Sequence, residues 1–349
     1  MQLIHHNMRQ IHIFIAIILL AGATLSCNKG VKKVSYPERG LTVGFYNLEN
    51  LFDTINDPDI NDEEFLPGSQ VRWNTEKYTK KLDNMSRVIA GMDPGSWPHL
   101  LGLAEIENET VLNDLIGNEQ IKAAGYQVVH IAGQDPRGIE VAAIYRADYI
   151  KPINIKALNP VIEGVTYRHI LYIKGLIMNR DTIHFFVNHW TSRFGGLDET
   201  KATRNGTARF VKHVTDSLLS VNAMNQLILV GDFNDNPNDE SMVKHLNAKP
   251  LMDDIEHPSL INLAFNSYKA GKGTLYYKGW DFFDQVIVSS SLIEGGKLLT
   301  SDIEIVKHDW MLFKPNQGEA RPNRTMSGGR YFGGFSDHLP VLIRLRQAK

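Results

Sequence analysis

The sequence predicts an α/β fold in which mixed β-sheets are covered by helices on the outside. Patterns typical of strands and helices alternate at the start of the chain and then give way to a strand-rich region. No repeat, low-complexity tract or shift in composition divides the chain after residue 40. We therefore expect a single domain over residues 41–347.

Each expected element follows from a local pattern. The helix expected at residues 75–92 has apolar side chains about 3.6 residues apart, including Tyr78, Met85 and Ile89, with Thr75 as its cap. Two further helices are expected at residues 109–124 and 200–221. Strands are expected at residues 41–46, 99–104, 126–131, 140–145, 170–177, 182–188, 226–230, 282–289 and 339–345. We expect 126–131 to pair with 140–145 and 170–177 to pair with 182–188, and we expect loops at 53–74 and 308–336.

The composition is that of a globular protein. Of its 349 residues, 43% are hydrophobic and 22% are charged, which excludes disordered and collagen-like chains. The formal net charge of -2 argues against a strongly basic nucleic-acid binder, although a local basic groove is still compatible with it. The single cysteine excludes a disulfide framework and a cysteine-rich zinc site.

The N-terminal residues 1–27 have the pattern of a targeting segment. Arg9 precedes an apolar run at residues 11–25, which is too short for a comfortable membrane span. The following Ala-Thr-Leu-Ser-Cys resembles the processing site of bacterial lipoproteins, with Cys27 as the lipidated residue, although Thr24 stands where that pattern prefers leucine. The alternatives are a plain secretory signal and an uncleaved anchor. We expect a linker at residues 28–40 and an extracytoplasmic domain tethered to the membrane only by its lipid, or else secreted.

Polar side chains follow several of the expected strands, where open α/β folds place their ligands. They are Asn47, Glu105, His189, Asp232, Asn234, Asp284, Asp337 and His338. Carboxylate and amide oxygens suit Mg²⁺, Mn²⁺ or Ca²⁺ rather than zinc. Histidines can transfer protons near neutral pH. This combination is suited to the hydrolysis of a phosphate ester.

These segments resemble the endonuclease/exonuclease/phosphatase superfamily, which has the DNase I-like fold. The resemblance extends from about Leu41 to Leu345, and the motifs occur in the family's order. They are Phe-Tyr-Asn-Leu-Glu-Asn, Leu-Ala-Glu-Ile-Glu-Asn, Val-Asn-His-Trp, Gly-Asp-Phe-Asn-Asp, Trp-Asp-Phe-Phe-Asp-Gln-Val-Ile-Val-Ser and Ser-Asp-His-Leu-Pro. The resemblance implies a four-layered α/β sandwich of two mixed sheets flanked by helices. It also implies a metal-dependent hydrolase of phosphoester bonds.

The resemblance assigns a role to each matching position. Glu105 would be the principal metal ligand, assisted by Asn47, and Asp337 would contact a metal. Asp232 would align or deprotonate the attacking water. Asn234 would hold a phosphate oxygen. Mg²⁺ is the expected cofactor, with Mn²⁺ or Ca²⁺ as alternatives.

The two histidines are the expected groups for handling protons and phosphate. His338 would be oriented by Asp284, for which Asp281 is the competing candidate. His189 would be the second catalytic histidine, and Glu140 could orient it.

Four further residues lie near these motifs in the sequence. Arg193 and Tyr145 are candidates for contacting the substrate, with a surface arginine as the alternative for Arg193. Glu107 and Asn108 are expected to cap the following helix rather than to act in the site.

The motifs indicate the chemistry more sharply than the substrate. The first hypothesis is a nuclease or nuclease-like phosphodiesterase acting on DNA or RNA, with Arg321, Arg324 and Arg330 as candidates for gripping a polyanion. The second is an enzyme acting on a lipid or a small phosphoester. The third, a binding relative without catalysis, is disfavoured because none of the central positions is substituted. We expect a monomer and no protein partner.

Overall fold

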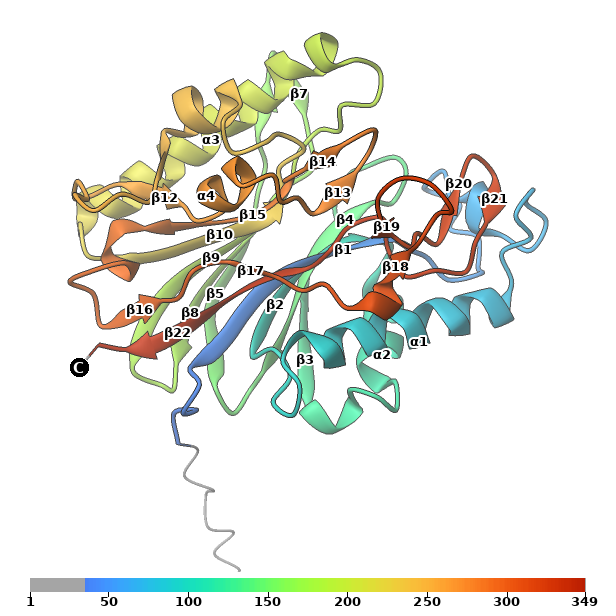
Figure 1. The fold of residues 1–349 in the computed structure, drawn as a ribbon, viewed down its shortest axis with the longest axis horizontal. Helices are drawn as coiled ribbons and strands as arrows, with labels where there is room; N and C mark the ends of the chain where they lie inside the picture. The colour runs from blue at the N-terminus through green and yellow to red at the C-terminus, as the bar shows by residue number, and fades with distance from the viewer. Residues whose placement is uncertain (1–34, 349) are drawn as a thin grey trace, which may run out of the picture. The chain divides into compact units, whose positions relative to one another are not determined.

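Two seven-stranded mixed β-sheets face each other in the computed structural model, which describes residues 35–348 (Figure 1). The expected signal segment, Cys27 and most of the linker lie outside the described residues. No helix in residues 35–348 is both long and apolar enough to cross a membrane.

The first sheet has the N-terminal and C-terminal strands of the domain at its centre. Its strands are, in spatial order, β16 (Leu298–Thr300), β22 (Val341–Gln347), β1 (Leu41–Leu51), β2 (Leu100–Ile106), β4 (Glu140–Arg146) and β3 (Tyr126–His130), with β17 (Glu304–Ile305) also paired to β22. β1 and β2 run parallel, and the other neighbours in this sheet are antiparallel.

The second sheet contains the other strands that lead to the site. Its spatial order is β11 (Ala248–Pro250), β12 (Leu260–Asn262), β15 (Asp284–Ser289), β10 (Gln226–Asp232), β9 (Asp181–His189), β8 (Ile170–Ile177) and β5 (Ile150–Leu158). β9 and β10 run parallel, as do β11 and β12.

Helices and short hairpins complete the domain. The helices are α1 (Thr75–Met92), α2 (Glu109–Gly117), α3 (Leu197–Val221) and α4 (Phe265–Lys269). Two-residue strands form the hairpins β6 (Val161–Ile162) with β7 (Val165–Thr166), β13 (Leu275–Tyr276) with β14 (Trp280–Asp281), β18 (Leu312–Phe313) with β19 (Arg321–Pro322), and β20 (Met326–Ser327) with β21 (Arg330–Tyr331). Single 3₁₀ turns occur at Glu63–Phe65, Lys122–Ala124, Ser290–Leu292 and Asp309–Met311, and a π-helical turn at Ser241–Leu246.

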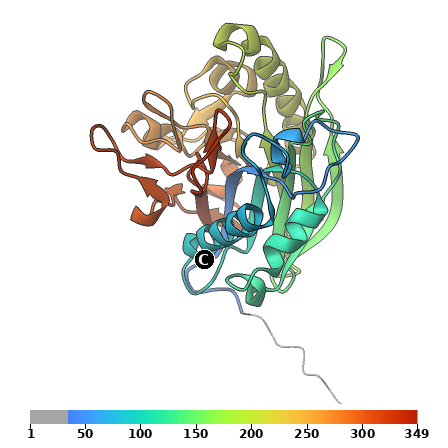
Figure 2. The ribbon, with the colours of Figure 1, turned by 90° about the vertical axis from the view of Figure 1, so that its right-hand side faces the viewer.

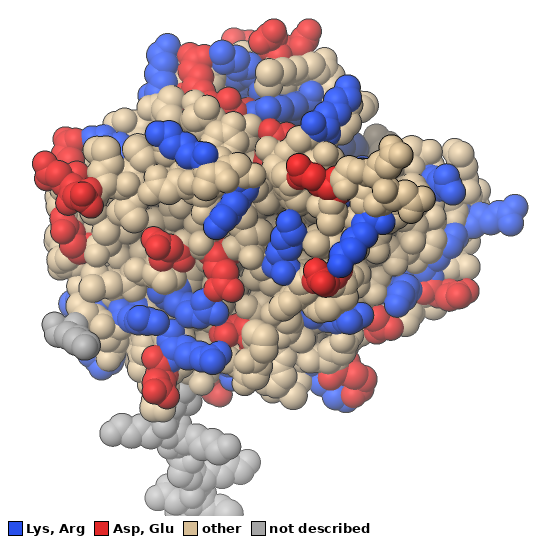
Figure 3. All heavy atoms as spheres, in the orientation of Figure 1, with Lys and Arg blue, Asp and Glu red and all other residues tan. Residues whose placement is uncertain are grey.

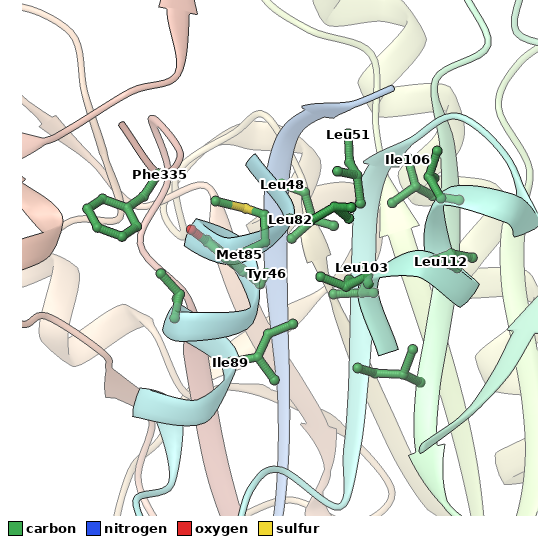
Figure 4. Packing of buried hydrophobic residues seen from close by; sticks show 14 of the residues in the cluster. Tyr46, Leu48, Leu51, Leu82, Met85, Ile89, Leu103, Ile106, Leu112 and Phe335 are labelled. Carbon is green, nitrogen blue, oxygen red and sulfur yellow. The ribbon is translucent and has the colours of Figure 1, made fainter. Parts of the chain in front are cut away.

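Three apolar layers separate four layers of secondary structure. Because side chains alternate along a strand, Val43 and Phe45 of β1 face the second sheet, whereas Tyr46 and Leu48 face α1 and α2. Figure 4 shows Met85 of α1 among the residues of the helix-side layer. A third cluster joins α3 to the outer face of the second sheet. Helices therefore cover both outer faces (Figures 1 and 2), which confirms the predicted four-layered sandwich.

Gly102 of β2 permits the two sheets to approach closely. A Cβ atom at this position would lie 2.9 Å from Val230 Cγ2 and 3.0 Å from Val187 Cγ2, which are on β10 and β9. A larger residue would force these strands apart. The close approach holds the ends of β2, β9 and β10 near one another.

Several boundaries differ from the sequence prediction. Asn74, rather than Thr75, caps α1, because its side chain accepts the backbone N–H of Lys77 (3.1 Å). The helix expected at residues 109–124 ends at Gly117, where the Asn118 N–H bonds to the Leu115 carbonyl. Residues 308–336, expected to be a loop, contain the short hairpins β18–β19 and β20–β21.

The expected strand pairs are present, but one long strand and several strands of two or three residues were missed. β3 pairs with β4 and β8 pairs with β9, both antiparallel. The long strand that was missed, β5, lies at the edge of its sheet and has exposed isoleucines at positions 153 and 155, so it lacks the alternation of a half-buried strand.

Candidate active site

The register of the strands brings the candidate residues to one edge of the paired sheets. Asn47 lies beside Ala104 at the carboxyl ends of the parallel strands β1 and β2. On the other sheet, His189 lies beside Asp232, which in turn pairs with Asp284. Carboxyl ends of parallel strands meet at the same edge of a sheet. The sheets thus deliver polar groups from both sides of the interface to one place.

A bulge places Glu105 in this group. The register shifts between Ala104 and Ile106, and Glu105 itself has a φ of 60° in the left-handed region. Its Oε1 lies 3.1 Å from Asn47 Nδ2 and 3.7 Å from His189 Nε2. Its Oε2 accepts the N–H of Asn50 (3.1 Å). This strained conformation is held where it directs a carboxylate into the site.

Asp232 is at the centre of the cluster. Its Oδ2 accepts a hydrogen bond from Asn47 Nδ2 (3.2 Å) and lies 3.7 Å from His189 Nε2 and 3.8 Å from His338 Nε2. Its Oδ1 accepts the N–H of Asn234 (2.9 Å). Burial raises the pKa of Asp232 to about 7, despite the opposing effect of His338. The carboxylate can therefore exchange a proton near neutral pH.

His338 is held as a charged imidazole by Asp284. Its Nδ1 lies 2.8 Å from Asp284 Oδ2, and its Nε2 faces Asp232. Burial lowers the pKa of His338, but the charges of Asp284 and Asp232 outweigh burial and hold the pKa well above its usual value. Asp281, the competing candidate, instead accepts a hydrogen bond from Asn236 (2.8 Å).

His189 is in the opposite electrostatic environment. Burial, reinforced by the charges of Arg168, His338 and Arg137, lowers the pKa of His189 well below its usual value. Its Nδ1 is buried and has no hydrogen-bond partner among residues 35–348. The site therefore pairs a charged histidine with a neutral one, which separates donor and acceptor roles.

The donor set fits a divalent cation. Ligand atoms of Glu105, His189 and Asp232 lie within 4.8 Å of one another, and the Asn47 amide lies beside both carboxylates. Two carboxylates brought together at a buried edge repel each other unless a cation or a proton compensates them. Glu105 and Asp232 supply the carboxylate oxygens that Mg²⁺ and Mn²⁺ prefer, whereas Asn47 directs its Nδ2 toward them and its Oδ1 accepts the N–H of Glu49 (2.9 Å).

Asp337 and Asn234 lie at the border of this cluster. Asp337 Oδ1 is 3.9 Å from His338 Nε2, and its Oδ2 accepts a hydrogen bond from Arg324 (2.6 Å). Asn234 donates its side-chain amide to the carbonyl of Trp190 (3.1 Å).

Tyr145 and Arg193 do not take the places expected for substrate contacts. Tyr145 pairs with Leu100 at the start of β2, five positions from Glu105, so it lies toward the opposite end of the sheet. The Arg193 guanidinium donates to the carbonyl of Asn234 (2.8 Å) and to Asp235 (3.0 Å). It supports the loop after β10.

Glu140 does not orient His189. Its carboxylate instead bonds to His130 Nε2 and to the N–H of Gly133. The strand register, which one sequence does not reveal, turns Glu140 toward the loop between β3 and β4. Asn108 caps α2 as expected, by accepting the N–H of Val111 (3.1 Å).

Two buried charged residues next to the site, Lys81 and Glu49, were missed by the sequence argument. Lys81 Nζ donates to Thr325 Oγ1 (2.6 Å) and to the Phe335 carbonyl (2.7 Å). The Glu49 carboxylate accepts the backbone N–H groups of Thr325 (2.7 Å) and Met326 (3.1 Å). The pair anchors the segment that leads to Asp337 and His338. The only signal in the sequence was a lysine on the apolar face of a helix.

A sandwich of two mixed sheets with acidic and histidine side chains converging at its strand ends defines a DNase I-like protein. The sequence profile described as Endonuclease/Exonuclease/phosphatase family matches residues 42–347, and the chain belongs to this family. Enzymes of the family are hydrolases acting on phosphoesters and generally depend on divalent metals.

Solved structures share the fold at low sequence identity. A mannosyl-6-phosphatase of Bacteroides thetaiotaomicron is similar at 17% identity and a TM-score of 0.54, with 88% of this chain and 99% of that chain covered. The catalytic domain of human Nocturnin with bound sulfate is similar at 12% identity and a TM-score of 0.53, with 90% of this chain and 97% of that chain covered. TDP2 of D. rerio, complexed with a single-strand DNA product, is similar at 13% identity and a TM-score of 0.52, with 88% of this chain and 98% of that chain covered. No curated protein matches the sequence.

We predict that Lys81→Met lowers the free energy of unfolding by about 3 kcal/mol, because it removes the two buried hydrogen bonds to Thr325 and Phe335 and a positive charge that offsets part of the buried charge of Glu49. Urea unfolding measures the loss. The exposed neighbour Lys80→Met is the control and should change stability by less than about 0.5 kcal/mol. Adding Glu49→Gln to Lys81→Met should restore part of the loss. Equal stabilities of the Lys80 and Lys81 variants would contradict the anchoring role.

We also predict that Asp232→Asn makes the metal-free protein less sensitive to alkaline pH. The pKa of Asp232 in the folded state is raised to about 7, so the folded protein favours the protonated carboxyl group. The resulting contribution to the free energy of unfolding is present at acid pH and is lost as pH rises from about 4 through 7. Between pH 5 and pH 8, the free energy of unfolding of the variant should therefore rise by on the order of 2 kcal/mol relative to that of the parent protein. Urea unfolding in EDTA at both pH values measures this gain, and parallel pH profiles would refute it.

Proposed function

We propose that the protein hydrolyses phosphoester bonds with the help of a divalent cation. The supporting observation is that Glu105, Asp232 and Asn47 converge with two histidines, of which His338 is charged and His189 is neutral. Glu105 and Asn47 would hold the cation, with Asp232 beside them and Asp337 at the border. A bound divalent cation supplies Lewis-acid stabilisation of the charge on the phosphoryl oxygens.

The protein side chains divide the remaining tasks. Asp232 would align the attacking water and accept its proton, with its Oδ1 held by the N–H of Asn234. The charged His338, held by Asp284, donates from Nε2 to the phosphoryl group. The neutral His189 faces the same centre from the other strand end and offers an uncharged imidazole for proton transfer.

The sequence favoured a nuclease, but each of the three arginines expected to grip a polyanion already contacts another side chain. Arg324 bonds to Asp337, and Arg321 and Arg330 lie over the rings of Phe313 and Phe332. On the face drawn in Figure 3, Lys and Arg side chains are interspersed with Asp and Glu. A long polyanion binds most tightly along a continuous basic surface. This favours a compact phosphoester as the substrate, with nucleic acid as the competing class.

A side-by-side assay separates the substrate classes. Purified residues 28–349 would be incubated with p-nitrophenyl phosphate, bis-p-nitrophenyl phosphate and supercoiled plasmid, in Mg²⁺, Mn²⁺ or EDTA. Metal-dependent release of p-nitrophenol without plasmid nicking would support a compact substrate. Metal-dependent nicking that exceeds ester cleavage would support a nuclease, and inactivity on all three would count against the hydrolase proposal.

We predict that Glu105→Gln and His338→Gln each lower kcat/KM by about a thousand-fold or more, because each removes a group that stabilises the transition state. Steady-state kinetics on the best of these substrates measure the loss. Glu109→Gln and His213→Gln remove the same chemistry from exposed positions and should keep near-parental rates. A Glu105 or His338 variant as active as its control would overturn the site.

We further propose that the domain acts outside the cytoplasm, tethered by lipid at Cys27. The supporting observation is the position of the one cysteine at the end of the apolar leader. Cys27→Ala should move the protein out of the membrane fraction and abolish its labelling by a radioactive fatty acid, without changing kcat/KM. Unchanged membrane association of this variant would instead indicate an uncleaved anchor.

A further inference from the structure

A pocket of about 170 Å³ opens beside His189. Its walls come from the loop between β3 and β4, the segment between β7 and β8, the end of β9 with the residues that follow it, and α3. The lining residues are Gln134, Asp135, Pro136, Tyr167, Arg168, His189, Trp190, Thr191 and Thr207. A water needs about 10–15 Å³ of such space, so a phosphate group with a few waters would fit.

Arg168 is the cationic residue in this wall, and Asp135 holds it in place. Arg168 Nε donates to Asp135 Oδ2 at 2.6 Å. The side chains are only 15% and 10% exposed, so the pair is largely shielded from solvent. Arg168 Nη1 is buried and has no hydrogen-bond partner among residues 35–348. A buried guanidinium with an unused donor is costly unless a ligand satisfies it.

The loop that carries Asp135 is itself fixed. Asp135 Oδ1 accepts the N–H of Arg137 (2.9 Å), which closes a local turn. Glu140 accepts the N–H of Gly133 at the start of the same loop, and Asn61 donates its N–H to the Pro136 carbonyl (2.7 Å). The pocket wall is thus built before any ligand arrives, and Glu140 acts as a positioning residue for it.

We propose that Arg168 is a substrate-binding residue that donates from Nη1 to an anionic phosphate oxygen in the pocket beside His189. This inference rests on the proposed phosphoester hydrolysis and deepens it. The guanidinium presents a planar set of donors that matches phosphate oxygens, and Asp135 occupies the Nε donor. The small pocket favours substrates that present a phosphate at a chain end or on a small molecule.

The test compares Arg168→Gln with Arg180→Gln, a control at the exposed turn between β8 and β9. With p-nitrophenyl phosphate, Arg168→Gln should raise KM about ten-fold or more, because it removes a charge-assisted hydrogen bond made on binding. Its kcat should stay within about three-fold. Arg168→Lys should bind p-nitrophenyl phosphate with intermediate strength, because lysine keeps the positive charge but lacks the planar set of donors of the guanidinium. Arg180→Gln should match the parent protein.

A second measurement does not depend on turnover. Titration calorimetry with inorganic phosphate should show binding to the parent and to Arg180→Gln, and binding about ten-fold or more weaker to Arg168→Gln. Asp135→Asn keeps Arg168 but loosens it, so it should weaken phosphate binding less than Arg168→Gln does. Thermal unfolding of each variant shows whether it folds.

These outcomes separate the inference from the proposed hydrolysis. Phosphate binding that depends on Arg168 in a protein inactive on every ester would support the pocket and count against the hydrolase. An active enzyme whose KM and phosphate affinity are the same in Arg168→Gln and Arg180→Gln would overturn the pocket and leave the hydrolase standing. A parent protein that binds no phosphate would also overturn the pocket. A loss in kcat alone, with KM and phosphate affinity unchanged, would overturn the binding role.

Discussion

The face-to-face packing of the two sheets is the constraint on which the site depends. Neither sheet carries a complete set of groups: Asn47 and Glu105 come from the first, and His189 and Asp232 come from the second. The apolar layer between the sheets, with Gly102 allowing close contact, sets the distance between the two halves. Chemistry and folding are therefore linked, because a shift of one sheet against the other would separate the carboxylates from the histidines.

The charges at this edge oppose the stability that the apolar layers provide. Asp232 is buried beside Glu105, and farther out Glu49 is buried beside Asp337, with burial raising the pKa values of Asp232 and Glu49 to about 7. Lys81, Arg324 and the charged His338 offset part of this repulsion. Such unfavourable electrostatic interactions are common at functional sites, where side chains are arranged for a ligand or a reaction rather than for the stability of the protein alone.

The sequence was sufficient to predict the four-layered architecture and the site residues that follow the strands. Apolar runs followed by Asn47, Glu105 or Asp232 are local signals, and the family motifs placed them in one site. It was insufficient where the answer depended on register or on distant contacts. Glu140 was misplaced because the register decides which way a strand residue points, and Tyr145 because it lies five positions along the paired strands from Glu105. Arg168 and Lys81 were missed because their partners, Asp135 and Thr325, are distant in sequence.

The central position of β22 in the first sheet has a consequence for the order of assembly. The last strand of the domain pairs with β1, and the hydroxyl of Tyr36 bonds to the carbonyl of Leu345, 309 residues later in the chain. During synthesis, β1 must wait for almost the whole polypeptide before one of its edges is covered. His338 arrives in the same final segment as β22. A growing chain therefore acquires its complete sheet and its complete set of reactive groups together, at the very end, and carries an open strand edge until then.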